Sequence, residues 1–205
     1  EIIVLELSSY QLEDSNDLLI DYAAILNFAP DHLERHGTLA NYISAKMKLL
    51  TNHKKQILVT NKNTYAQMNS IKELNLNALD TFTGNVLFIG DDASIDQVNS
   101  LIQTKNFTYN IKNFKLQGQH NLENLATAIL LAESIGCKPE VIQERIPTFT
   151  GLNHRFQMIR KLDGTEFIND SKSTNLHSLN SWLKDYPNDQ KLLLLIGGKN
   201  KDKDI

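Results

Sequence analysis

A cluster of polar side chains follows a short apolar run near residue 170. Phe167-Ile168 leads into Asn169-Asp-Ser-Lys-Ser-Thr-Asn175, which supplies an acid, a base and three hydroxyl groups. At the end of a strand in an α/β sheet, such groups commonly meet a bound ligand. The same residues would also start an ordinary helix, with Asp170, Ser171 or Ser173 as N-cap. Both interpretations remain open on spacing alone, so the other polar clusters of the chain must be weighed with this one.

Two of those clusters lie in the first fifty residues. Glu6 interrupts the apolar run 2–7, and a buried acid there requires a cation or another partner. Mg²⁺ bound with a nucleotide would suit Glu6, because that ion takes few carboxylates beside phosphate and water; an edge residue reaching solvent is the alternative. His32 follows a second apolar run as a candidate metal ligand, general base or plain loop residue. Lys46 lies in a predicted helix, where a lysine is ordinarily solvated.

Three weaker candidates follow along the chain. Asn121 and Asn124 stand at the start of a predicted helix and would suit a base-binding site, although Asn121 is also an ordinary N-cap. Arg155 follows His154 and would either form a structural ion pair or reach a phosphate across a cleft. Lys201 ends a glycine-containing turn after an apolar run, where it could meet an anionic substrate.

The elements that must position these residues alternate between strands and helices. Continuous rather than alternating apolar runs predict a sheet covered on both faces. The repeated alternation indicates the α/β class. We predict strands over 2–7, 22–28, 56–60, 86–89, 156–162, 165–169 and 192–196, an edge hairpin over 107–114, and helices over 38–52, within 61–80, and over 121–135, 139–145 and 174–185. Residues 147–151 break the pattern, which favours a domain boundary with domains over 1–148 and 149–205.

The composition of the chain argues against several classes of function. The net charge of −3 and the absence of a Lys/Arg block argue against a nucleic-acid partner. The single cysteine, Cys137, favours a reduced, cytoplasmic setting. No apolar run approaches the roughly 18 residues of a membrane span. The chain contains no Gly-x-x-x-x-Gly-Lys-Ser/Thr phosphate loop. If this protein binds ATP, its phosphate loop lies upstream of residue 1, and we then expect the chain as given to be inactive and to bind ATP poorly.

Several segments together resemble the Mur ligase family over nearly the whole chain. They are Leu5-Glu-Leu-Ser-Ser-Tyr-Gln-Leu-Glu13, Ile25-Leu-Asn-Phe-Ala-Pro-Asp-His-Leu-Glu-Arg-His36, Ala45-Lys46, Gly118-Gln-His-Asn121, Phe149-Thr-Gly-Leu-Asn-His-Arg-Phe156 and Asn169-Asp-Ser-Lys-Ser-Thr-Asn175. The first and last forms are most similar to the branch that adds D-glutamate. Such ligases have a UDP domain, a central ATPase domain with a mostly parallel sheet flanked by helices, and a Rossmann-like domain for the amino acid. The resemblance implies that residues 1–148 belong to the central domain and 149–205 begin the third.

The resemblance also implies a role for each candidate residue. Glu6 and His32 match magnesium ligands, and Lys46 matches a lysine that CO₂ carbamylates, so that it can hold a second Mg²⁺. Ser9 and Gln11 lie in the segment that meets the UDP-sugar substrate. The nucleotide cleft is expected to be lined by Asn121, Asn124, Arg155, Asp170 and Lys172. Thr174 and Lys201 are expected to approach D-glutamate, although Asn200 stands where a glycine is common after the lysine.

The implied reaction joins D-glutamate to UDP-N-acetylmuramoyl-L-alanine at the expense of ATP, with Mg²⁺, in peptidoglycan precursor synthesis. The carboxylate of the UDP-sugar substrate first attacks the γ-phosphate, and the amine of D-glutamate then displaces phosphate from the acyl phosphate. We expect a cytoplasmic monomer with no nucleic-acid or membrane partner. The alternatives are another ligase of the superfamily, such as the folylpolyglutamate synthase type, and a non-catalytic nucleotide-binding relative.

Overall fold

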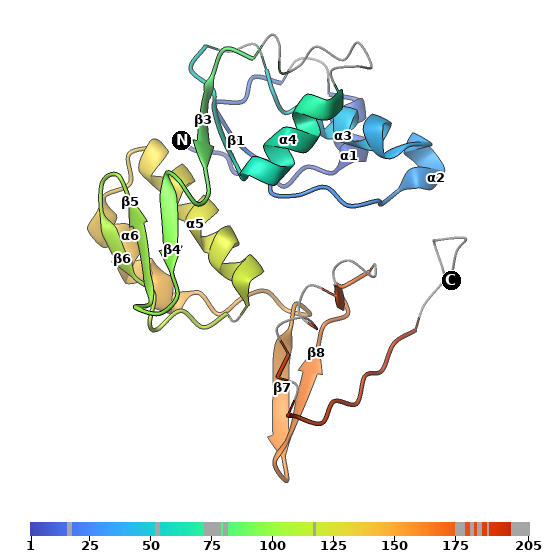
Figure 1. The fold of residues 1–205 in the computed structure, drawn as a ribbon, viewed down its shortest axis with the longest axis vertical. Coiled ribbons are helices and arrows are strands. Elements are labelled where there is room, and N and C mark those ends of the chain that lie inside the picture. Colours follow the sequence, from blue (N-terminus) through green and yellow to red (C-terminus); the bar gives the residue numbers. More distant parts are fainter. Residues whose placement is uncertain are drawn as a thin grey trace.

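The computed structural model describes residues 1–15, 18–51, 54–71, 79, 82–116, 118–174, 179–180, 183, 186–187 and 189–197. Along the chain follow a parallel sheet and an antiparallel sheet, each with helices packed against it, and then a separate β-hairpin (Figure 1). The helices are α1 (Ser9–Glu13), α2 (Leu33–His36), α3 (Leu39–Met47), α4 (Lys62–Ser70), α5 (Gln119–Ser134), α6 (Pro139–Arg145) and the 3₁₀ helix η2 (Ile146–Thr148). The strands are β1 (Tyr22–Ala24), β2 (Ile57–Thr60), β3 (Asn85–Phe88), β4 (Ala93–Asp96), β5 (Leu101–Thr104), β6 (Thr108–Asn110), β7 (Gln157–Leu162) and β8 (Thr165–Asn169).

The first sheet is parallel, in the order β1-β2-β3, and helices cover both of its faces. Successive residues of β2 point to opposite sides, as in any strand. Leu58 packs into a buried cluster with side chains of α3 and α4, whereas Val59 packs into a second cluster with side chains of α5. The prediction of an α/β fold with a sheet covered on both faces is therefore confirmed.

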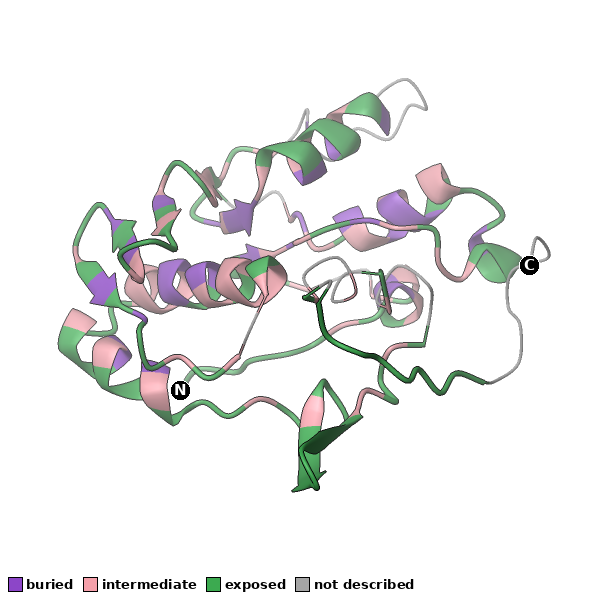
Figure 2. Cartoon of the chain, turned by 60° about the horizontal axis from the view of Figure 1, so that its bottom comes forward, coloured by how far each residue is buried: buried purple, intermediate pink, exposed green. Residues whose placement is uncertain are grey.

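The second sheet is antiparallel, in the order β4-β5-β6, and α5 lies against it (Figure 1). Its strand β6 lies at the edge and pairs with β5, so the edge position is as predicted, but the hairpin predicted within 107–114 is wrong because that range holds a single strand. Both buried clusters draw their members from residues 23–146. The hairpin of β7 and β8 projects from the bottom of the view in Figure 2 and is coloured mostly as exposed. Within the described residues, no helix combines the length and the apolarity needed to cross a membrane.

Several predicted helices are confirmed with shifted ends. Thr38 caps α3, because its side chain accepts a hydrogen bond from the Asn41 N–H. This helix ends at Met47 rather than at residue 52, and a short turn follows it. Helix α5 is closed by Gly136, whose φ of 85° suits glycine. Helix α6 has the predicted bounds and begins with a proline, which needs no hydrogen-bond partner at that position.

Two predicted strands are wrong. Residues 2–7 form no strand, and their apolar side chains are exposed, with Val4 90% accessible. Residues 192–196 likewise have no strand, and Leu195 is 87% accessible. Apolar content predicts burial, but a strand also needs a neighbouring strand to complete its hydrogen bonds, and neither segment pairs with one among the described residues. The predicted strand over 22–28 shortens to β1, and the predicted helix over 174–185 falls mostly outside the described residues.

A half-buried carboxylate, that of Glu133, fastens α5 to the second sheet. The Glu133 carboxylate accepts hydrogen bonds from Thr104 Oγ1 at 2.7 Å, from the Tyr109 hydroxyl at 2.7 Å and from Asn106 Nδ2 at 2.9 Å. Tyr109 is fully buried, and that burial, together with the neighbouring carboxylate, raises the pKa of its hydroxyl. The tyrosine therefore acts as a permanent donor to Glu133.

Glu133→Ala is expected to destabilise the fold more than an ordinary surface substitution. It leaves the fully buried Tyr109 hydroxyl without its acceptor, at about 1–3 kcal/mol, whereas the Thr104 hydroxyl can still donate to the Phe107 carbonyl at 3.2 Å. Urea denaturation of the chain measures the free energy of unfolding. Glu144→Ala, at an exposed position of α6, is the control and should change it by less than about 0.5 kcal/mol. An equal loss in both variants would show that this network contributes nothing.

Candidate active site

The short helix α1 begins with a capping box that fixes the segment carrying Ser9 and Gln11. The Ser8 hydroxyl accepts from the Gln11 N–H at 3.3 Å, and the Gln11 side-chain oxygen accepts from the Ser8 N–H at 2.9 Å. These reciprocal bonds satisfy two backbone donors at the helix start. The side chain of Gln11 is exposed, and its oxygen is part of this capping box. Its expected contact with the UDP-sugar stays a prediction.

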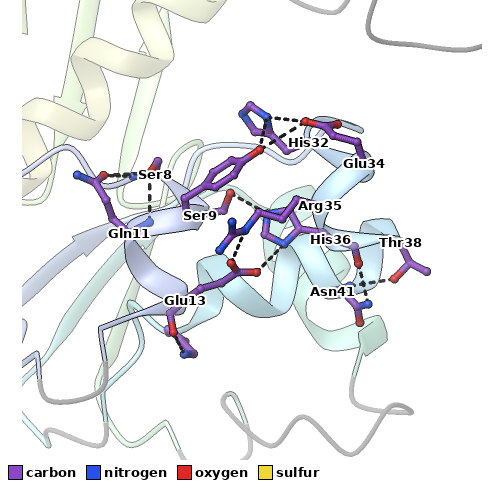
Figure 3. A network of polar contacts seen from close by, with 12 residues as sticks. Ser8, Ser9, Gln11, Glu13, His32, Glu34, Arg35, His36, Thr38 and Asn41 are labelled. Atoms are coloured by element: carbon purple, nitrogen blue, oxygen red, sulfur yellow. Dashed lines mark hydrogen bonds and ion pairs between the residues drawn. The ribbon is translucent and has the colours of Figure 1, made fainter.

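Helix α1 is joined to α2 by a chain of hydrogen bonds through a buried histidine (Figure 3). His36 Nε2 lies 3.0 Å from the Ser9 hydroxyl, and its Nδ1 lies 3.0 Å from Glu13 Oε1. The second oxygen of Glu13 accepts from Arg35 Nε at 2.7 Å. Ser9 is 1% exposed, so its hydroxyl cannot act as a nucleophile towards a substrate despite the serine–histidine–carboxylate order. These residues instead hold α1 and α2 at a fixed separation.

The turn before α2 places His32 beside this pair of helices. His32 has a left-handed backbone, with φ of 55°, and its N–H donates to Asp31 Oδ1 at 3.0 Å. Its ring meets the Tyr10 ring edge-on, with centroids 4.9 Å apart. The Tyr10 hydroxyl lies 3.2 Å from His32 Nδ1. The predicted metal ligand is therefore held in one orientation from both its backbone and its side chain.

Lys46, in the last turn of α3, is half-buried rather than solvated. Its ammonium group lies 5.5 Å from the centre of the Tyr42 ring. Burial lowers the pKa of Lys46, against the opposing attraction of the Asp31 and Glu6 carboxylates. Two consequences follow. The charges of Glu6 and Asp31 both act on this amine, and more of the amine is neutral near pH 7 than for an ordinary lysine. A neutral amine is the form that adds CO₂.

The nucleotide candidates Asn121 and Asn124 lie in the first turns of α5. Gly118 precedes the helix with φ of 92°, a conformation that favours glycine. Asn124 is exposed, and Asn121 is half-buried. Between Gly118 and these residues, His120 has a buried Nδ1 atom without a hydrogen-bond partner among the described residues. Such an atom is unusual in a folded protein and is typical of a site that another group completes.

The polar cluster after β8 folds back on the loop before β7. Asp170 accepts hydrogen bonds from the Phe156 N–H at 3.0 Å and from the Ser173 hydroxyl at 2.5 Å. The Lys172 N–H donates to the His154 carbonyl at 3.1 Å. Asp170 therefore ties this cluster to the loop before β7, and no helix that it could cap begins there among the described residues. The side chains of Arg155, Lys172 and Thr174 are exposed. Lys201 lies outside the described residues.

The structure thus gathers part of the predicted site and leaves part of it apart. The charges of Glu6 and Asp31 act on Lys46, and His32 lies beside Asp31, whereas Arg155, Asp170 and Lys172 flank the hairpin of β7 and β8. Among the described residues, no three His, Cys, Asp or Glu side chains form a ready-made metal site. A metal at this place would need further ligands, such as a carbamate on Lys46, phosphate and water. The sequence analysis missed Tyr10, Glu13 and His36, whose partners lie more than twenty residues away.

Comparison with known proteins identifies the family of this chain. The model of the Mur ligase middle domain matches residues 1–132. The UDP-N-acetylmuramoylalanine--D-glutamate ligase of Leptospira interrogans is 46% identical over 210 residues, which cover 100% of this chain and 43% of the relative. The chain therefore belongs to the Mur ligase family. It spans less than half the length of the curated relatives that it matches.

Solved structures share the fold at low sequence identity. MurF from Acinetobacter baumannii superposes with a TM-score of 0.62 and 18% identity, over 80% of this chain and 36% of that one. FolC of Escherichia coli, in complex with DHPP and ADP, superposes with a TM-score of 0.61 and 17% identity, over 83% of this chain and 40% of that one. The two scores are nearly equal, so the fold does not separate the branches of the family.

Proposed function

We propose that this chain forms the metal- and nucleotide-binding part of an ATP-dependent ligase that adds D-glutamate to UDP-N-acetylmuramoyl-L-alanine. The observation that carries the proposal is the 46% identity, across the whole chain, to a ligase named for that reaction. The site supports it, because a desolvated lysine lies within reach of two carboxylate charges. We call the protein of the relatives' length that contains this chain the full-length protein.

The residues present fit a magnesium site. Glu6 would supply a carboxylate, His32 an imidazole nitrogen, and Lys46, once carbamylated, a further anionic oxygen. Carbamylation replaces a cation by an anion, and the lowered pKa of Lys46 favours the neutral amine on which it depends. Bound Mg²⁺ would neutralise the charge that develops between a carboxylate and a phosphate. This chain's own contribution is to position these groups rather than to provide a nucleophile.

The remaining assigned residues would orient the other reactants. We assign Asn121 and Asn124 to the nucleotide and Arg155 and Lys172 to its phosphates, with Asp170 holding the loop that carries them. Ser9 and Gln11 would belong to the segment that binds the UDP-sugar, and their hydrogen bonds would hold α1 in place for it. Thr174 would face D-glutamate. We further propose a division into domains over 1–148 and 149–205, and a cytoplasmic, monomeric enzyme without nucleic-acid or membrane partners.

Product analysis on the full-length protein tests this function. With ATP, Mg²⁺, UDP-N-acetylmuramoyl-L-alanine and D-glutamate, one amide product and one equivalent of phosphate should form. Omitting any one component should abolish both. A folate substrate with L-glutamate tests the folylpolyglutamate type of ligase, and turnover with that pair alone would reject the proposal. Nucleotide binding without any product would instead favour a non-catalytic relative.

Lys201→Ala in the full-length protein is expected to raise KM for D-glutamate about ten- to a hundredfold with little change in KM for ATP. Loss of a charge-assisted contact costs about 1.5–3 kcal/mol, which corresponds to that change in affinity. Steady-state kinetics with each substrate varied separately measures it. Lys191→Ala, at an exposed position, is the matched control. An unchanged KM for D-glutamate in Lys201→Ala would remove Lys201 from the site.

A further inference from the structure

The side chains of Tyr10, His32 and Glu34 form a hydrogen-bonded row between α1 and the start of α2. The Tyr10 hydroxyl, from α1, lies 3.2 Å from His32 Nδ1 and 3.4 Å from Glu34 Oε1 in α2. Glu34 Oε1 also lies 3.6 Å from His32 Nδ1 (Figure 3). Tyr10 and Glu34 thus contact the same nitrogen of the His32 ring, Nδ1. The position of the proton in this row decides which nitrogen of His32 can bind a cation.

The hydrogen-bonding capacity of Tyr10 and Glu34 decides which nitrogen of His32 carries the proton. An ionised carboxylate only accepts hydrogen bonds, and a hydroxyl has a single proton to donate. A hydrogen bond to a charged acceptor is the stronger one, so Tyr10 donates to Glu34 and accepts from His32. The Glu34 side chain is exposed in α2, and an exposed carboxyl group is ionised near pH 7, so it remains an acceptor. The Nδ1 atom of His32 must then carry the proton.

Two further contacts hold the tyrosine in this place. The Arg35 guanidinium lies over the Tyr10 ring at 4.6 Å from its centre, and the same arginine is anchored to Glu13 at 2.7 Å. The His36 ring meets Tyr10 edge-on at 5.8 Å. The ring therefore cannot swing away without breaking the contacts between α1 and α2.

The opposite nitrogen of the ring lies near the Asp31 carboxylate. His32 Nε2 lies 3.8 Å from Asp31 Oδ2, and the charge of Asp31 acts on Lys46 together with that of Glu6. A lone pair on Nε2 would therefore lie beside Asp31, a carboxylate whose charge also acts on Lys46. Metal-binding histidines in proteins are commonly oriented by a carboxylate or another acceptor on their second nitrogen.

We propose that Tyr10 and Glu34 are positioning residues that fix the Nδ1–H form of His32 and so present Nε2 to a divalent cation. This inference rests on the proposed function, in which His32 is a metal ligand. Neither Tyr10 nor Glu34 contacts the cation. The row couples α1, which also carries Ser9 and Gln11, to the orientation of the metal ligand.

The first test reads the proton position directly, without metal or turnover. Long-range ¹H–¹⁵N NMR on histidine-labelled, metal-free full-length protein distinguishes the two neutral forms, and His32→Gln identifies the signal. We expect the Nδ1–H form in the wild type and a shift towards Nε2–H in Tyr10→Phe. Glu34→Gln, which keeps the shape but removes the charge, should shift it in the same direction. Tyr65→Phe, which alters a tyrosine packed on Phe88, should leave it unchanged. The Nε2–H form in the wild type would overturn the proposal.

The second test separates this inference from the function on which it rests. Mn²⁺ binding followed by electron paramagnetic resonance should be about tenfold weaker in Tyr10→Phe, the lower end of the loss for residues that orient metal ligands. Tyr65→Phe should bind as the wild type does. If His32→Gln binds Mn²⁺ normally, the metal role of His32 fails, whatever the NMR result. If His32→Gln weakens binding and Tyr10→Phe does not, the positioning role fails alone.

Discussion

Lys46→Ala in the full-length protein should lower turnover by about a hundred- to a thousandfold, the loss typical of removing one preorganised charged group from an active site. The half-buried position of Lys46 and its lowered pKa favour the neutral amine that a carbamate requires. The variant lacks the two oxygens that the carbamate would offer. Lys62→Ala removes an exposed lysine that pairs only with Asp91 on the surface, and it should keep wild-type turnover.

The same variant offers a chemical rescue. Acetate or formate should restore part of the activity of Lys46→Ala, because a short carboxylate can occupy the space of the missing carbamate. Chloride at equal ionic strength should not. Turnover is measured against carboxylate concentration in both variants. Near wild-type turnover in Lys46→Ala would mean that Lys46 is only a buried helix residue, and the proposed metal site would lose its central ligand.

Glu6→Gln is expected to lower turnover and to raise the Mg²⁺ concentration needed for half-maximal activity at least about tenfold. Even residues that only orient metal ligands cost about 10- to 100-fold when they are replaced, and Glu6 is assigned to the metal directly. Glutamine keeps the shape of the side chain but removes its charge. Glu166→Gln, which disrupts an exposed pair with Lys161, is the control. An unchanged Mg²⁺ requirement would place Glu6 outside the metal site.

Local signals in the sequence predicted local structure well. Thr38, Pro139 and Gly136 each act on the residues next to them, and α3, α6 and α5 begin or end where these residues indicate. A continuous apolar run predicted the buried strand β2 for the same reason. By contrast, the run 2–7 failed as a strand, because pairing depends on a neighbour that the run itself does not specify. Strands β4 and β5 were missed because the alternating burial of β4 brings polar residues such as Ser94 and Asp96 to its exposed side.

The candidate site could likewise be predicted only in part from the sequence. The resemblance to the Mur ligases singled out Glu6, His32 and Lys46, and in the structure the Glu6 carboxylate acts on the Lys46 amine. The residues that support them had no local signal. Ser9 and His36 are 27 positions apart, and Tyr10 and His32 are 22 positions apart. Their contacts arise only once α1 and α2 pack together, so spacing along the chain could not predict them.

The transfer of oxygen from substrate to phosphate tests the central claim most directly. UDP-N-acetylmuramoyl-L-alanine labelled with ¹⁸O in its terminal carboxylate is incubated with the full-length protein, ATP, Mg²⁺ and D-glutamate. If the carboxylate attacks the γ-phosphate, one labelled oxygen must leave with the phosphate when the amine displaces it. The account predicts one ¹⁸O atom in the inorganic phosphate for each amide formed. Amide formation with unlabelled phosphate would contradict the acyl-phosphate route and the role given to this site.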